Sequence, residues 1–535
     1  MVALGLTKNP SLFAIWFLFL LTVGSTSEAS NLGWRANDYP FEKLPPKAQK
    51  LLKTLPHRAI DLETVIKSGM AKSDSFQSLI AAKAAIQANE WMAQGAIDTT
   101  FFASANYVDD RHEPMSSFAA SNQQNRSFAL GLMKGFSTGT RLTSQLSLGE
   151  FSYELPTGLG IPSPGTQSSG EFSIALSQDL WRNSFGQSTS RKLRAGAFMS
   201  AANDFAVTDQ MENWFLQLSE VFYGAWLSQS QARAARSSVT RSERLAEITR
   251  IKLKRGTAER PDLLQVEANL ASAKVNLQNA EKRVDDVWRK LVVTLKFPLE
   301  WLNISGMKVP VAIYPIPRQT FATCGKPGQI SPPPAANSLT NKHQQMALAA
   351  KNSLEASQSE MSPELSLELK ASGNSIDSES GTALNESIQG THPQISALLK
   401  FSVPLSNSLA KGQALNAYKE QRQAEALASM EQSNLQIDWV NACANLFRAQ
   451  SASSELKKAY LMQNERGQLE EKRFRNGRIT APLVIRAEEE ATGAELIWLQ
   501  SEVDLRKAAW QVKKLKGEIE TYMTQLASTS NSSNK

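Results

Sequence analysis

The sequence is poor in the side chains that most often carry out chemistry. Its 535 residues include four histidines and two cysteines. None of the histidines stands in a metal-binding motif with cysteine, aspartate or glutamate, and the phosphate-binding pattern Gly-x-x-x-x-Gly-Lys-Ser/Thr does not occur. The acidic run Glu488-Glu489-Glu490 falls in a helical pattern, where solvated side chains are expected. We therefore predict no catalytic residue, no metal site and no cofactor, and hence no enzyme. The histidines are His57, His112, His343 and His392.

Long apolar runs are also scarce, and the clearest one stands at the N-terminus. Leu12 to Leu21 is apolar throughout, Lys8 precedes it, and Ser27-Glu28-Ala29 offers a cleavage site. This pattern predicts a signal peptide over residues 1–29, with an uncleaved anchor as the alternative. No cysteine stands near the site, which argues against a lipoprotein. No later run reaches the roughly 18 apolar residues of a spanning helix. The mature chain is expected to be either soluble outside the cytoplasm or to cross a membrane as strands.

The charge pattern argues against a nucleic-acid-binding protein. The net charge is +7, but both signs are interleaved along helical stretches such as Arg241-Ser242-Glu243-Arg244, which is typical of solvated helix faces. No compact basic patch with interleaved aromatic residues occurs, so we predict no nucleic-acid partner.

Cys324 lies in a proline-rich connector and Cys443 in a helical pattern. We expect two separate thiols, with a disulfide as the alternative in an exported chain.

The strongest signal in the sequence is an internal repeat. Gly256 is followed by Pro261, and Gly477 is followed at the same distance by Pro482. Both segments then run into an apolar heptad, and an offset of 221 residues maps one copy onto the other. A duplicated unit of this length indicates an architecture rather than an active site. The paired heptad positions are Leu270, Ala273, Leu277, Ala280, Val284, Val287 and Leu291, with Ala491, Ala494, Trp498, Ser501, Leu505, Ala508 and Val512.

Each half repeats one order of elements: a helix, alternating strand-like segments, a long helix, a glycine break and a shorter return helix. The long helix is predicted over 187–255 in the first half and 411–475 in the second, because apolar residues recur at helical spacing without proline. Helices of this length must pack on other helices along their whole extent. The predicted divisions are a signal peptide (1–29), an extended lead-in (30–57), a first repeat (58–297), a connector (298–336), a second repeat (337–526) and a disordered tail (527–535).

The strand-like segments also have predicted positions. A helix over 61–91 precedes the strands of the first half, which fall within 97–180 and are more numerous than those of the second. We interpret Lys134 to Leu159 as an added hairpin or an extended loop. In the second half a helix over 338–360 precedes alternating segments at 365–371 and 395–405, separated by a polar loop.

These features together resemble the TolC-like outer-membrane efflux proteins, over nearly the whole mature chain. Three features carry the resemblance. One is the junction between strand and long helix, Leu176 to Leu180 in the first half and Phe401 to Leu405 in the second. Another is the glycine turn followed by Asp262 to Glu267, and the third is the alanine-rich heptad of the return helices. The resemblance implies an α+β membrane protein: a homotrimeric transmembrane β-barrel continued by a long periplasmic α-helical coiled-coil barrel, with internal duplication.

The resemblance also implies a function and partners. The chain would be the outer-membrane channel of a tripartite efflux or type I secretion system in a Gram-negative bacterium, with a periplasmic helical extension. It would give passive exit to solutes or proteins delivered by an inner-membrane transporter and a periplasmic adaptor, and its strands would contact outer-membrane lipid. The glycine turns would form the periplasmic tip where the adaptor docks; the alternative is that each glycine only turns the chain. The tip candidates are Arg255, Gly256, Thr257, Asn476, Gly477 and Arg478.

Other classes of protein stay open. The chain could be a periplasmic coiled-coil adaptor, or a structural protein without a membrane barrel. An adaptor would be expected to place one coiled hairpin between β-rich halves, whereas this sequence predicts two duplicated hairpins.

Overall fold

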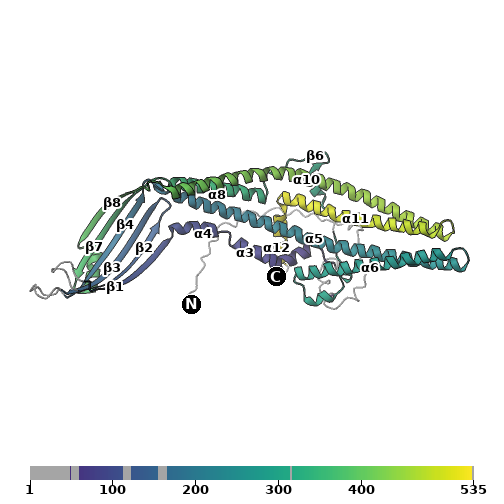
Figure 1. The fold of residues 1–535 in the computed structure, drawn as a ribbon, viewed down its shortest axis with the longest axis horizontal. Coiled ribbons are helices and arrows are strands. Elements are labelled where there is room, and N and C mark those ends of the chain that lie inside the picture. Colours follow the sequence, from purple (N-terminus) through teal and green to yellow (C-terminus); the bar gives the residue numbers. More distant parts are fainter. Residues whose placement is uncertain (1–48, 50–58, 113–121, 155–164, 314–315, 533–535) are drawn as a thin grey trace, which may run out of the picture.

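The computed structural model describes Gln49 and residues 59–112, 122–154, 165–313 and 316–532. The predicted signal peptide lies outside the described residues, as does the extended lead-in apart from Gln49. Figure 1 shows an elongated molecule, with one sheet at one end and paired long helices that reach the other end. Among the helices that the structure describes, none combines the length and the apolarity that a bilayer crossing requires.

Four long helices form the body of the molecule, and they match in pairs. Helices α5 (Gln187–Lys254) and α10 (Ser408–Arg475) have 68 residues each. Their return helices α6 (Arg260–Thr294) and α11 (Ala481–Leu515) have 35 residues each. A helix of 68 residues is about 100 Å long. The duplicated hairpins predicted from the sequence are therefore confirmed, and the two hairpins run side by side in Figure 1.

The shorter helices differ more from expectation. The single helix predicted over 61–91 is three helices, α2 (Leu62–Lys72), α3 (Asp74–Ala84) and α4 (Ala88–Gln94). Ser73 adopts an extended backbone between the first two, and residues 85–87 form a turn between the last two. Helix α8 spans Ser338–Glu360 as predicted. After Gly517, α12 covers Glu518–Ser532, so the tail predicted to be disordered is helical to Ser532. Short 3-10 helices lie at Gly95–Ile97, Ser184–Gly186, Leu299–Asn303 and Gly306–Lys308.

The sheet is antiparallel, has six strands in the described residues, and draws on both halves of the chain. Its order is β1-β2-β3-β4-β7-β8, so β4 and β7 join the halves. The first half supplies four strands and the second half two. The extra pair is the hairpin β2–β3, which begins earlier than the predicted Lys134. The strands are β1 (Thr99–Asp110), β2 (Asn122–Gly135), β3 (Thr140–Glu154), β4 (Thr166–Asp179), β7 (Glu364–Asp377) and β8 (Pro393–Ser402).

The loop between β7 and β8 holds a helix that the sequence did not predict. Helix α9 covers Ser380–Gln389 and packs on β4 and β7. A segment interpreted as a polar loop is therefore folded onto the sheet.

The register gives the sheet two unlike faces. Residues paired across strands lie on one face, so the pairs Leu148–Gly170 and Phe172–Gly373 place β3, β4 and β7 side chains together. We call this side the apolar face and the opposite side, with Ser173, Glu171 and Lys370, the polar face. Exposed residues of the apolar face are Phe101, Tyr107, Phe128, Leu132, Leu142, Ile174, Leu176, Leu369, Ile395, Leu399 and Phe401. On the polar face the exposed apolar residues are Val108, Met133, Ile376 and Leu398.

The main core lies midway along the helices, where the connector between the halves wraps around them. Trp226 and Phe222 of α5 are buried there with Trp288 of α6. The Gln229 amide nitrogen donates to the carbonyl oxygens of Gly306 (2.8 Å) and Val309 (2.6 Å), which holds the connector against α5. The burial of this amide is therefore matched by hydrogen bonds.

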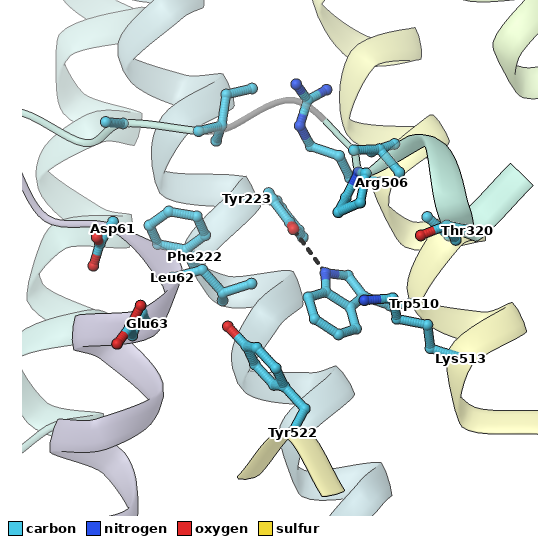
Figure 2. A pocket seen from close by; sticks show the side chains of 15 residues that line it. Asp61, Leu62, Glu63, Phe222, Tyr223, Thr320, Arg506, Trp510, Lys513 and Tyr522 are labelled. Carbon is cyan, nitrogen blue, oxygen red and sulfur yellow. Dashed lines mark hydrogen bonds between the residues drawn. The ribbon is translucent and has the colours of Figure 1, made fainter. Parts of the chain in front are cut away.

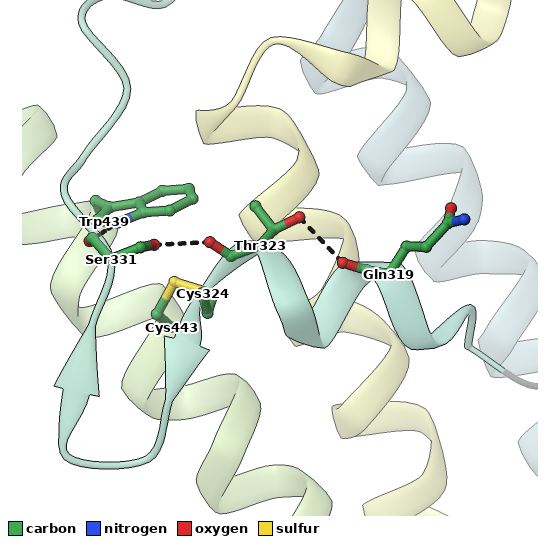
Figure 3. The surroundings of a disulfide bond; sticks show 6 residues. All are labelled: Gln319, Thr323, Cys324, Ser331, Trp439 and Cys443. Carbon is green, nitrogen blue, oxygen red and sulfur yellow. Dashed lines mark hydrogen bonds between the residues drawn. A yellow bond between two sulfur atoms is a disulfide. The ribbon is translucent and has the colours of Figure 1, made fainter.

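A disulfide fixes the second part of the connector. Cys324 follows α7 (Arg318–Thr323) and opens the small hairpin of β5 (Gly325–Lys326) and β6 (Gln329–Ile330), and it is bonded to Cys443 of α10. Figure 3 shows the bond beside Trp439, whose indole nitrogen donates to the Ser331 carbonyl at 2.9 Å. The expectation of two separate thiols was wrong, because a sequence separation of 119 residues hides their proximity in the fold.

Candidate functional site

The two glycine turns close the hairpins at the end of the molecule opposite the sheet (Figure 1). Gly256 has a φ of +72° and Gly477 a φ of +75°, and each directly follows the C-cap residue of a long helix, Arg255 or Asn476. The amide of the next residue donates back into the helix in each case, from Thr257 to the Lys252 carbonyl (2.9 Å) and from Arg478 to the Arg473 carbonyl (3.0 Å). This is the Schellman geometry that favours glycine.

The six predicted tip residues are all exposed and lie in these two turns. A Cβ added to Gly256 or Gly477 would meet no heavy atom within 4 Å. The glycines are therefore required for the left-handed backbone and not for lack of space. The turns also leave Arg255 and Asn476 accessible on the surface.

The structure brings the two tips into contact through residues that the sequence did not single out. The Lys252 ammonium lies 3.9 Å from the Phe474 ring centroid and also donates to the Phe474 carbonyl oxygen. Burial lowers the pKa of Lys252. Phe474 itself is buried with Leu245 and Val484 in a cluster shared by both hairpins. The repeat could not reveal this contact, because Lys252 and Phe474 are not equivalent positions in the two copies.

A buried carboxylate lies farther from the tip, between α5 and α11. Glu488 is 5% exposed, and its Oε2 atom has no hydrogen-bond partner in the described part of the chain. Burial raises its pKa to about 7, which nearby Arg241 partly opposes. The expectation that Glu488 is solvated was wrong, because α11 turns this position toward α5 while Glu489 remains exposed. The helical interior thus holds a group that titrates near neutral pH.

A cavity of about 220 Å³ lies at the middle of the molecule, where α5, α11 and α12 meet the start of α2. Figure 2 shows the side chains that line it. Aromatic rings form much of its wall. The Trp510 indole nitrogen donates to the Tyr223 hydroxyl at 2.8 Å, and the Trp510 and Tyr522 ring centroids are 5.3 Å apart. Burial raises the pKa of Tyr522 to about 12. These contacts join α12 to the long helices.

One sequence pattern of hydrolases is present but lies in the wrong structural setting. Gly135-Phe136-Ser137-Thr138-Gly139 matches Gly-x-Ser-x-Gly, in which the serine should sit between a strand and a helix. Here the segment is the turn between the antiparallel strands β2 and β3. The structure thus gives this serine no nucleophile elbow. Within the described residues no group of histidine, cysteine and acidic side chains is arranged to hold a metal ion.

Comparison with known proteins identifies the fold. No family model matches the chain, and no curated protein matches it. Among solved structures, the outer membrane protein VceC from Vibrio cholerae is 11% identical with a TM-score of 0.62, over 85% of this chain and 96% of that one. The Campylobacter jejuni CmeC outer membrane channel is 10% identical with a TM-score of 0.61, over 85% of each chain.

A further similarity points the same way. The outer-membrane channel OprN is 13% identical with a TM-score of 0.61, over 85% of this chain and 90% of that one. At such identities the similarity establishes the fold. This chain, with its duplicated helical hairpins and one sheet built from both halves, therefore has the fold of the TolC-like outer-membrane channels.

Proposed function

We propose that three copies of the chain form one outer-membrane channel for efflux. Their sheets would close into a shared transmembrane β-barrel, and their helices would continue as a tunnel through the periplasm. The observation that carries this proposal is the sheet itself, which has an exposed apolar face and, within the described residues, two edge strands that each pair on one side only. A sheet of this kind is unstable alone and suited to a closed barrel in lipid.

The unpaired edges support assembly. Among the described strands, β1 pairs only with β2 and β8 only with β7, so each leaves a row of backbone groups without partners. An unpaired group in lipid costs several kcal/mol, and pairing β8 of one copy with β1 of the next removes that cost. Three sheets of six strands give a barrel of 18 strands, a number that leaves an aqueous lumen.

The helices support the same assembly. Helix α10 carries exposed apolar residues in pairs three positions apart, namely Leu415 with Tyr418, Leu427 with Met430, and Ile437 with Val440; Met430 and Ile437 are seven positions apart. A stripe with this spacing is typical of a surface that packs against another helix. We infer that the stripe is covered by a neighbouring copy.

The disulfide supports a location outside the cytoplasm. Disulfides persist in oxidising compartments such as the bacterial periplasm, and Cys324 and Cys443 are bonded in this fold. This agrees with the signal peptide predicted over residues 1–29.

The channel would be passive, and its tip would be the place where partners dock. The polar face of the sheet would line the lumen, so solutes would pass along a wall with few exposed apolar side chains. An inner-membrane transporter and a periplasmic adaptor would deliver the cargo, in a tripartite efflux or a type I secretion system. The exposed turns at Arg255, Gly256 and Thr257 and at Asn476, Gly477 and Arg478 would contact the adaptor.

Membrane fractionation tests the channel. We expect the mature protein in the outer-membrane fraction, as trimers that dissociate to monomers when heated in detergent. Recovery as a soluble periplasmic monomer would contradict the proposal and favour an adaptor or structural protein.

Acidic substitutions test the tips. Gly256→Glu with Gly477→Glu would place charge at the proposed adaptor contact, at a cost of about 1–2 kcal/mol per residue for a left-handed backbone. We expect trimers to persist while export is lost and crosslinking to the adaptor disappears. Gly493→Glu in α11, which adds one such carboxylate away from the turns, is the control. Loss of trimers in the double variant alone would show that the glycines serve only as turns.

A further inference from the structure

Helix α9 lies on the apolar face of the sheet. Gly170 and Gly373 belong to that face, because their register partners are Leu148 and Phe172. A Cβ added to Gly170 would lie 2.5 Å from the Ala383 carbonyl oxygen, and one added to Gly373 would lie 2.6 Å from the Ser387 carbonyl oxygen. The backbone of α9 thus approaches the sheet at two positions that have no room for a side chain.

Polar contacts fix α9 at one end of that face. The hydroxyls of Ser168 and Ser380 lie 2.8 Å apart, and the Ser375 hydroxyl donates to Glu386 at 2.7 Å. The Ser380 hydroxyl also donates to Glu150 at 3.2 Å. Ser168 and Ser375 are only 2% and 3% exposed. Helix α9 therefore covers the hydroxyls of Ser168 and Ser375, which occupy the apolar face at this end of the strands.

The distance along β4 places this end of the sheet. Asp179 ends β4 just before α5, and Ser168 stands eleven residues earlier in the same strand. At about 3.3 Å per residue this is roughly 36 Å along the strand, or about 28 Å of height at a barrel tilt near 40°. The hydrocarbon core of a bilayer is about 30 Å thick. Measured along the barrel axis, α9 would thus lie about one membrane thickness from Asp179, where β4 ends before α5.

One flank of α9, beside the sheet-facing residues Ala383 and Ser387, carries apolar side chains. Ile388 on this flank is 54% exposed, and Leu384, one turn earlier, is partly buried. We propose that α9 is a membrane-contact helix, docked on the outside of the barrel, whose Leu384 and Ile388 meet lipid at the outer boundary of the bilayer. The partner is lipid, by continuity with the apolar face on which α9 sits. This inference rests on the proposed membrane barrel.

Site-specific quenching tests the inference. Single-cysteine variants Ile388→Cys, Ile395→Cys and Ile376→Cys are labelled with a fluorophore and reconstituted in vesicles whose acyl chains carry a nitroxide. The two native cysteines are bonded and buried, so the introduced thiol is the reactive one. Ile395 lies on the apolar face and Ile376 on the polar face, and both are exposed. We expect severalfold quenching at positions 388 and 395 and little at position 376.

The outcomes separate this inference from the proposed function. Quenching at 395 without quenching at 388 would overturn the role of α9 and leave the channel intact. Absence of quenching at 395 would contradict the membrane barrel and, with it, the inference. Quenching at 376 instead of 395 would show that the two faces are assigned the wrong way round, which also overturns the inference.

A docking variant gives a second test. Gly373→Leu should displace α9 from the sheet and abolish quenching at position 388 while trimers persist. Gly381→Leu adds the same side chain where a Cβ would meet nothing within 4 Å, and should keep the quenching. Unchanged quenching in a trimeric Gly373→Leu variant would mean that the close approach of α9 to Gly373 does not hold the helix on the sheet, contrary to the inference. If that variant fails to assemble, the single-cysteine comparison still decides.

Discussion

Removing the disulfide should cost the protein much of its stability. The Cys324–Cys443 bond closes a loop across a sequence separation of 119 residues. In the chain-entropy model a loop of this length restricts the unfolded chain by about 5 kcal/mol at 25 °C. Both sulfurs are fully buried beside Leu435 and Leu446, so replacement with alanine also loses packing of the order of 1 kcal/mol. We expect Cys324→Ala with Cys443→Ala to lower the free energy of unfolding by about 6 kcal/mol.

Guanidinium unfolding of the detergent-solubilised protein, followed by circular dichroism, measures this loss. The single variant Cys443→Ala should unfold like the double variant, because either change opens the loop. Reductant present during unfolding should destabilise the unmodified protein and leave the double variant unaffected. A double variant within about 1 kcal/mol of the unmodified protein would refute the reasoning, since it would mean that the connector does not constrain the unfolded chain.

Three further predictions concern the helical region. Because the pKa of Glu488 is raised from 4.5 to about 7, the folded state keeps a proton that the unfolded state releases, so stability should fall by about 3 kcal/mol as pH rises from 4.5 to 7. Glu488→Gln should reduce this slope in pH-dependent unfolding, whereas Glu489→Gln should not; the remainder would come from Glu212, whose pKa burial also raises to about 7. Equal slopes in all three proteins would contradict the assignment. Lys252→Met should loosen the contact with Phe474 and lower stability by about 1 kcal/mol, seen as faster hydrogen exchange at both tips; exchange that speeds at one tip only would argue against the contact. Gln229→Leu should cost about 2 kcal/mol, because it leaves connector carbonyls buried without donors, and a proteolysis rate equal to that of the unmodified protein would count against this.

The long elements could be predicted because their signals are local. Apolar residues at helical spacing, without proline, define α5 and α10, and alternation of apolar and polar residues defines the strands. The glycine turns were predictable for the same reason, since Gly256 and Gly477 stand at equivalent positions of a repeat. The TolC-like fold followed from the order of these elements.

What could not be predicted depends on contacts between distant parts of the chain. Helix α9 has serine, glycine and asparagine in its ten residues, and its place on the sheet depends on the gaps at Gly170 and Gly373. The bond between Cys324 and Cys443 and the burial of Glu488 near Arg241 likewise join segments more than a hundred positions apart in the sequence. No local pattern marks such contacts.

The two halves contribute unequal numbers of strands to the sheet, four and two, but both numbers are even. In each half the chain enters the sheet from a helix and leaves it into a longer helix at the same end, so every half must make an even number of crossings. The hairpin β2–β3 is the smallest insertion that satisfies this condition without shifting where α5 begins. Insertion of a hairpin could therefore widen the sheet without moving the helices. In an assembly of three copies, each such hairpin would add six strands to the barrel.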